Sequence, residues 1–201
     1  MPRQVDHDAR RSELVSATWS VITDQGLDGV TLRKVAEAAG CTTGRIAHYF
    51  SGREELLVSA LRAAYRATTD RMAEVARSTS GSERLRKVVY ESLPLDDERL
   101  REWNVWIAFW AAAAADEKLA RENAQRYREW KGLLSKLIAE IHNDPAAPAL
   151  ELVSLIDGLG IRTALVPSAR NRRLARGTVD RWIGDLADQG SDSARRHQAV
   201  P

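Results

Sequence analysis

The sequence predicts an all-α fold of about nine helices, and three observations support this. Apolar residues recur every three or four positions along most of the 201 residues, which is the period of an amphipathic helix. No stretch of alternating β-branched residues is long enough to form a sheet. Hydrophobic residues make up 44% and charged residues 29%, with few Gly and Pro, which is typical of a helix-rich globular protein. The expected helices cover residues 10–25, 31–40, 43–50, 51–77, 80–93, 96–115, 116–142, 147–165 and 172–187.

The first three expected helices are bounded by cap residues. The helix over 10–25 has one apolar face and stops before Gly26, which suits a C-terminal cap. Thr31 can cap the next helix with its hydroxyl, and Gly40 ends it. The third short helix then covers 43–50.

The later helix ends are marked by capping pairs and prolines. Ser51 and Glu54 have the spacing of a capping box, which predicts the start of a long helix there. Pro94 ends the fifth helix, and 143–148 is the clearest loop because it contains two prolines. The small, polar and charged residues of 189–201 predict a disordered tail.

The segment 32–50 has the spacing of a helix-turn-helix. This motif needs a small residue where its two helices pack, a turn residue with an unusual backbone conformation and an aliphatic anchor in the second helix. Ala36, Gly40 and Ile46 stand at these positions. The side chains left facing outward on the second helix suit phosphate contact and the reading of base edges: Thr42, Thr43, Gly44, Arg45, His48 and Tyr49.

Net charge adds little to this hypothesis. The chain carries a formal +2, and residues 1–53 hold seven Arg and Lys against six Asp and Glu. DNA binding is therefore inferred from where the charges lie and not from their sum.

The run GVTLRKVAEAAGCTTGRIAHYFSGREELL, Gly29 to Leu57, closely resembles the DNA-binding signature of the TetR family. The resemblance implies phosphate contacts from Thr31 and Tyr49, and from Arg53, which replaces the usual Lys. It implies groove contacts from Thr42, Thr43, Gly44, Arg45 and His48, and Arg33 is a further candidate. The family usually has an aromatic residue where this chain has Ala47.

The stretch LPLDDERLREWNVWIAFWAAAAADEKLARENAQRYREW, Leu93 to Trp130, resembles the C-terminal domain of BetI-like members of the same family. Three of its tryptophans share one helix face because they are spaced i, i+3 and i+7. Such a face can line an effector pocket or form a Trp-rich core, and both interpretations stay open. The candidate pocket residues are Trp103, Trp106, Phe109, Trp110, Tyr127 and Trp130.

The last two expected helices have apolar faces too broad for one isolated pair. In TetR-like proteins the corresponding helices pair with their symmetry mates, so we expect a homodimer; the alternative is packing within one chain. A two-fold dimer would read a pseudo-palindromic operator with recognition helices about 34 to 36 Å apart. The candidate interface residues are Val153, Ile156, Gly160, Val179, Trp182 and Leu186.

The domain organisation that follows is a DNA-binding domain over 1–53, an effector-binding and dimerisation domain over 54–188, and the tail over 189–201. We expect a transcriptional regulator of double-stranded DNA, a repressor that a small-molecule effector releases from its operator. The alternative is a helical ligand sensor or interaction protein with the same fold but without sequence-specific DNA binding.

Several other classes are disfavoured. No Ser-His-Asp or Cys-His order and no phosphate-binding Gly-rich loop is evident, so we expect no enzyme and no catalytic residues. The single cysteine, Cys41, cannot form an intrachain disulfide, and no Cys/His cluster predicts a metal site or a cofactor. The N-terminus has no secretory signal and no apolar run is long enough to span a membrane, so we expect a cytoplasmic protein.

Overall fold

The computed structural model describes residues 7–198, and the side chains only as far as residue 190. Within this part of the chain there are nine helices and no strand, which confirms the all-α prediction. The helices are α1 (His7–Gln25), α2 (Leu32–Ala38), α3 (Thr43–Tyr49), α4 (Arg53–Arg77), α5 (Gly81–Ser92), α6 (Asp97–Ala113), α7 (Glu117–Ile138), α8 (Ala146–Leu165) and α9 (Ala169–Gln198). None of these helices is both long enough and apolar enough to cross a membrane.

The turn between α2 and α3 forms as the sequence predicts. Gly40 has φ of +60°, a left-handed conformation that residues with a Cβ rarely adopt. Its N–H donates to the Glu37 carbonyl at 3.2 Å, and the N–H of Cys41 donates to the Ala36 carbonyl at 2.9 Å. These two bonds form a Schellman motif, which satisfies carbonyl groups at the end of α2 and turns the chain toward α3.

The start of α4 differs from the expected capping box. The backbone N–H of Ser51 donates to a carboxylate oxygen of Glu55, not of Glu54, at 2.8 Å, and the Ser51 hydroxyl lies 3.0 Å from the same oxygen. Glu54 instead forms an ion pair with Lys118 at 3.1 Å. The predicted partner was wrong by one residue. Because α4 begins at Arg53, the carboxylate that accepts from the Ser51 N–H is that of Glu55 and not that of Glu54.

The last helix is longer than its apolar pattern suggests. We expected it to end at Ala187, and α9 continues to Gln198, through most of the segment expected to be a tail. Ala, Arg and Gln in this segment have good helix propensity, and apolar periodicity does not detect a helical end without an apolar face. Residues 199–201 lie outside the described part.

The chain forms two compact units. The first contains the described residues up to Ala67 together with Asn104–Ala120, and the second contains Thr68–Trp103 and the described residues from Arg121 onward. Both α4 and α6 therefore contribute residues to both units.

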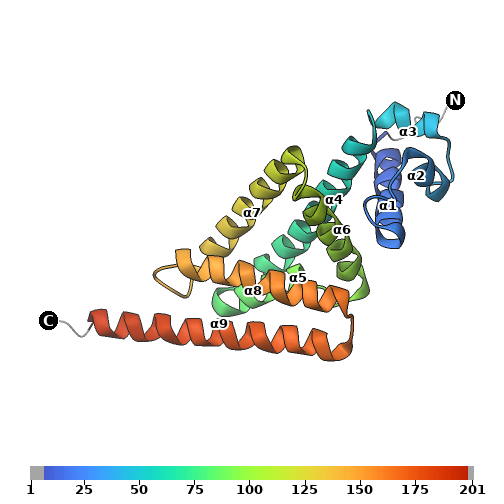
Figure 1. Ribbon diagram of the computed structural model, residues 1–201. Coiled ribbons are helices and arrows are strands. Elements are labelled where there is room, and N and C mark those ends of the chain that lie inside the picture. The colour runs from blue at the N-terminus through green and yellow to red at the C-terminus, as the bar shows by residue number, and fades with distance from the viewer. Residues whose placement is uncertain (1–6, 199–201) are drawn as a thin grey trace. The chain divides into compact units, whose positions relative to one another are not determined.

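In the first unit, α2 packs against α1 and α3 (Figure 1). The core of this unit is mainly aliphatic, and its fully buried side chains include Val30, Val35, Ile46, Leu56 and Leu61.

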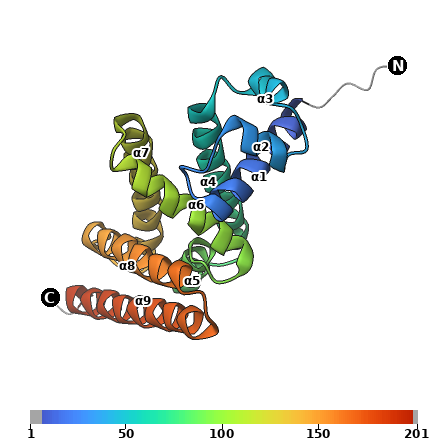
Figure 2. The same cartoon turned by 45° about the vertical axis from the view of Figure 1, so that its right-hand side comes forward.

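In the second unit, α9 lies beside both α8 and α5, as Figures 1 and 2 show. Leu85, Leu152, Val179 and Ile183 are completely buried there. The unit also contains a partly buried ion pair, in which Arg71 donates two hydrogen bonds of 2.7 Å to the buried Glu102 carboxylate.

Candidate DNA-binding surface and effector region

The helix-turn-helix is held together by small and aliphatic side chains. Val35 of α2 and Ile46 of α3 are completely buried, and Ala36 of α2 is 4% exposed. Phe50, which follows α3, is also buried. These residues have the interior positions that the sequence pattern predicts, so packing on its inner face contributes to the orientation of α3.

The outer face of α3 is polar and open to solvent. Thr42 caps this helix, and its hydroxyl oxygen accepts a hydrogen bond of 3.3 Å from the N–H of Arg45. A Cβ added at Gly44 would meet only the Thr42 hydroxyl, at 3.9 Å, so another molecule can approach the backbone closely at this position. The exposed set is the one expected for base and phosphate contacts, without Tyr49: Thr42, Thr43, Gly44, Arg45 and His48.

Tyr49 is half-buried, and its ring belongs to an aromatic cluster. The ring of His7 lies 4.5 Å from the Tyr49 ring, the His48 ring lies 5.1 Å from it, and the two histidine rings lie 6.1 Å apart. The sequence suggested no role for His7, because residues far apart in a chain give no sign that their rings will meet. The cluster holds Tyr49 at the edge of the exposed face of α3.

Arg11 joins three helices beneath this cluster, and sequence analysis did not identify it. One guanidinium nitrogen donates to the carbonyl oxygen of Tyr49 at 2.6 Å, and another donates to Glu55 at 2.8 Å and Ser59 at 3.1 Å. The same guanidinium lies over the Phe50 ring, 4.2 Å from its centroid. The hydrogen bond from the Ser51 N–H, together with those from Arg11 and the Ser51 hydroxyl, lowers the pKa of Glu55 to about 2. Glu55 is therefore an anion at neutral pH, which stabilises the junction of α1, α3 and α4.

The other predicted DNA contacts lie around this face. The Thr31 hydroxyl caps α2 by accepting from the N–H of Lys34 at 3.2 Å, and its own proton can still be donated. Arg33 is exposed beside Glu37, with 3.8 Å between their charged groups. The Arg53 guanidinium donates to the carbonyl oxygens of Val30 at 2.8 Å and Leu27 at 2.7 Å, so part of its donor capacity supports the loop before α2.

The Trp-rich face of α6 is divided between the two units. Trp103 belongs to the second unit, where its indole N–H donates to the Ser92 carbonyl at 2.7 Å. Phe109 is buried in the first unit with Leu61 and Leu119. Trp106 and Trp110 also belong to the first unit, and both are half-buried. Helical spacing alone cannot predict this division, because α6 leaves one unit and enters the other between Trp103 and Asn104.

Tyr127 and Trp103, two of the predicted pocket residues, contact α8 at positions three residues apart. The hydroxyl of Tyr127 donates to the Asp157 carboxylate at 2.8 Å, and burial raises the pKa of Asp157 to about 6 while this hydrogen bond opposes the rise. Three residues further along α8, a Cβ at Gly160 would overlap the Trp103 ring. Asp157 was not among the predicted site residues, although a carboxylate within an apolar helix is a signal that could have identified it. Trp130, the remaining predicted residue on α7, is half-buried.

The predicted interface residues of α8 and α9 are largely enclosed by the chain itself. Val153, Ile156, Val179 and Leu186 are at most 5% exposed, Gly160 is buried under Trp103, and Trp182 is half-buried. The apolar residues that these helices leave in solvent are different ones. Leu150, Ile161 and Leu165 of α8 are 56%, 37% and 66% exposed, and Leu174 of α9 is 41% exposed.

Two family models match most of the chain. Residues 14–60 match the model of bacterial regulatory proteins of the TetR family. Residues 81–188 match the C-terminal model of BetI-type transcriptional repressors. The first match contains the helix-turn-helix, and the second contains Trp103, Tyr127 and Asp157.

Individual proteins agree with these models. The HTH-type transcriptional regulator PksA of Bacillus subtilis is 30% identical over an alignment that covers 98% of this chain and 100% of the relative. The crystal structure of a transcriptional regulator from Rhodococcus sp. Rha1 has a TM-score of 0.82 and 27% identity, and covers 95% of this chain and 99% of that one. A regulator from Saccharomonospora viridis, solved in complex with choline, has a TM-score of 0.80 and 23% identity, and the match covers 88% of this chain and 96% of that one. The chain belongs to the TetR family of DNA-binding transcriptional regulators.

Proposed function

We propose that this regulator is a homodimeric repressor that binds a pseudo-palindromic operator in the cytoplasm and is released by a small organic cation. In this proposal residues 1–53 bind DNA, and residues 54–188 bind the effector and form the dimer. The observation that carries it is the contrast within α3: Ile46 is completely buried, whereas Thr43, Arg45 and His48 are exposed.

The roles on DNA follow from side-chain chemistry. The Arg45 guanidinium suits a bidentate contact to guanine in the major groove, and it has no hydrogen-bond or ion-pair partner among the residues that the structure describes. Thr42, Thr43 and His48 flank it, and Gly44 allows the backbone to approach the duplex. The Thr31 and Tyr49 hydroxyls and the Arg33 and Arg53 guanidiniums would bind phosphates beside the groove.

The effector class is inferred from Asp157 and its aromatic neighbours. Burial raises the pKa of the half-buried Asp157 carboxylate, and a bound cation would stabilise the ionised form of this group. The faces of Trp103 and Tyr127 can attract the same cation through their ring quadrupoles. The choline complex of the Saccharomonospora viridis regulator is consistent with a quaternary ammonium ligand in this fold.

A second copy of the chain would cover the exposed apolar residues of α8 and α9. Leu150, Ile161 and Leu165 lie on the solvent side of α8, with the small residues Ser154 and Gly158 between them. Small residues allow two copies of α8 to approach closely, and a self-complementary patch is what a two-fold dimer requires. Two recognition helices would then enter successive major grooves.

Release would follow from the continuity of α4. This helix begins at Arg53, in the DNA-binding unit, and ends at Arg77 in the unit that contains Asp157. A cation that binds better to one tilt of α4 would shift the population toward that tilt, and the spacing of the recognition helices in the dimer would change with it.

The direct test is selection of bound sequences from a random DNA pool, followed by measurement of operator release by choline and tetramethylammonium. The proposal expects an enriched pseudo-palindrome and release by the cations. A pool without enrichment would instead support a helical sensor without sequence-specific DNA binding.

A further inference from the structure

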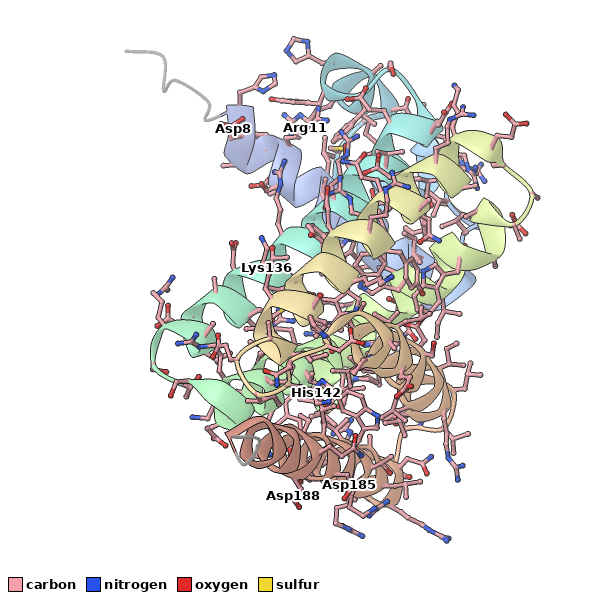
Figure 3. The ribbon with its side chains drawn as sticks, turned by 90° about the vertical axis from the view of Figure 1, so that its left-hand side faces the viewer. Asp8, Arg11, Lys136, His142, Asp185 and Asp188 are labelled. Atoms are coloured by element: carbon pink, nitrogen blue, oxygen red, sulfur yellow. The ribbon has the colours of Figure 1, made fainter. Side chains whose placement is uncertain are left out.

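The exposed face of α9 carries positive charge near its start and negative charge farther along. Arg170 and Arg173 are exposed, and so are Asp185 and Asp188, which Figure 3 labels. All four lie on the side of the helix away from the completely buried Val179. Asp185 comes twelve positions after Arg173, about 18 Å along the helix axis, so these charges cannot pair within one copy of α9.

These four side chains differ from other charged residues of α9 in their lack of partners. None of them forms a hydrogen bond, ion pair or ring contact with the residues whose side chains the structure describes. On other sides of the helix, Arg172 donates to Asp97 at 2.8 Å, and Asp180 accepts a hydrogen bond of 2.9 Å from Arg86. The outward charges are therefore the ones left for another molecule.

The outward charges are placed symmetrically about the level of Val179. Arg170 and Asp188 come nine positions before and after it, about 13.5 Å along the helix axis. Arg173 and Asp185 come six positions before and after it, about 9 Å along the axis. A two-fold axis perpendicular to α9 at this level relates the helix to an antiparallel copy. The arginine pair of each copy then lies at the levels of the aspartate pair of the other.

The residues between the charges match in size in the same arrangement. Leu174 is 41% exposed and lies at the level of Gly184 of the second copy, where an added Cβ would meet nothing within 4 Å. Arg181, a further charge on this face, lies at the level of Gly177, which leaves room for it. Its guanidinium already donates to the Thr178 hydroxyl of its own chain at 3.3 Å, so it needs no acid from the second copy.

We propose that two copies of α9 pack antiparallel across this axis, with Arg170 and Arg173 of each copy bound to Asp185 and Asp188 of the other. This arrangement rests on the proposed homodimeric function and specifies the orientation, the register and the charges that select the partner. A parallel copy would bring arginine to arginine and aspartate to aspartate, and like charges at an interface oppose binding. A second chain of the same sequence therefore fits this face better than a partner of uniform charge.

Charge reversal in the full chain tests this arrangement, with the dissociation constant of the dimer measured by analytical ultracentrifugation. Arg170→Glu with Arg173→Glu makes the face acidic throughout, and Asp185→Lys with Asp188→Lys makes it basic. We expect either change to raise the dissociation constant at least about tenfold, because attractive contacts become repulsive at both symmetric sites. An equimolar mixture of the two variants should form a heterodimer, and all four substitutions in one chain should restore the homodimer.

Two control variants separate register from net charge. Arg128→Glu with Lys131→Glu makes the same charge change at the same spacing among exposed residues of α7, and it should leave the dimer intact. Arg181→Ala should also leave it intact, because a glycine lies opposite. The chain with all four substitutions keeps the net charge of the wild type, so it decides the matter if a double variant does not fold.

The possible outcomes distinguish this arrangement from the homodimer itself. A monomeric wild-type chain would overturn both. A wild-type dimer whose dissociation constant neither reversal changes would overturn the arrangement of α9 alone. So would a mixture of the two folded variants that forms no heterodimer, or an Arg181→Ala variant weakened as much as the reversals.

Discussion

Arg11 and Tyr49 are 38 positions apart in the chain, and a hydrogen bond of 2.6 Å joins the guanidinium of the first to the carbonyl oxygen of the second. Through this bond α1 holds the C-terminal end of α3, the helix that we propose enters the major groove. The same guanidinium holds Glu55 near the start of α4. The orientation of the proposed recognition helix therefore depends on a residue that is not expected to contact DNA.

Substitution Arg11→Ala should lower the free energy of unfolding by about 2 kcal/mol, because charge-assisted hydrogen bonds to Tyr49 and Glu55 are lost together. Urea denaturation followed by circular dichroism measures this change. Arg10→Ala is the control: Arg10 is adjacent and exposed, and its ion pair with Glu13 lies within one helix. Equal midpoints for the two variants would show that the Arg11 bonds do not stabilise the fold.

Arg45→Ala should lower operator affinity by about 1–3 kcal/mol and affect nonspecific DNA binding much less, because a bidentate contact to a base is lost. Arg53→Ala should weaken both kinds of binding and reduce the salt dependence, because its contact is to phosphate. Gel-shift titrations of the selected operator and of an unrelated duplex across salt concentrations compare the two. Unchanged operator affinity in the Arg45 variant would contradict its role in base recognition.

Substitution of two exposed aliphatic residues of α8 tests the proposed dimer. Ile161→Glu with Leu165→Glu should convert the dimer to a monomer, because like charges would face each other across the two-fold axis. Light scattering after size-exclusion chromatography measures the mass. Val153→Ala, at a buried position of the same helix, should lower stability and leave the dimer intact. A monomeric wild-type chain would refute the dimer itself.

Asp157 makes a pH-dependent contribution to stability. Its pKa of about 6 lies above its ordinary value of 3.8, so the folded state holds the proton more tightly than the unfolded state does. The stability contributed by this proton is therefore present below about pH 4 and is lost as the pH rises through about 6. The difference in unfolding free energy between wild type and Asp157→Asn should fall by about 2 kcal/mol between pH 4 and pH 7.

Urea titrations at a series of pH values measure this difference, with Asp185→Asn, an exposed carboxylate of α9, as the control. The same Asp157→Asn variant should bind choline at least tenfold more weakly if the carboxylate holds the cation. If the unfolding free energies of wild type and Asp157→Asn changed in parallel with pH, the environment of Asp157 would not favour its protonated form.

Glu102 is 3% exposed and bonded to both Arg71 and Thr68, so its removal should be costly. We expect Glu102→Ala to lower the free energy of unfolding by about 3 kcal/mol, since Arg71 would lose a partner in a partly buried site. Glu98→Ala is the matched control, because Glu98 is exposed and lies 4.0 Å from the same guanidinium. Thermal and urea unfolding should separate the two variants clearly.

The helix-turn-helix was predictable because its determinants are local. Ala36, Gly40 and Ile46 act over spacings that a helix and a tight turn impose, and the TetR-like run that contains them leads to the same assignment. The ends of most helices were also predicted to within a few residues, since caps and prolines act on their neighbours. The exception at Ser51 shows the limit: both Glu54 and Glu55 follow it, and only the path of the backbone selects Glu55.

The sequence by itself determined the all-α class, the helix order, the position of the recognition helix and the family, because periodicity and short motifs encode these properties locally. Only the tertiary structure decided that Arg11 holds Tyr49, that Asp157 meets Tyr127, and that Val153 and Val179 are enclosed by their own chain while Leu165 is not. An apolar helix face shows that a residue will be buried but not which partner will cover it. That choice depends on contacts between segments far apart in the chain, and these contacts exist only after the helices have packed.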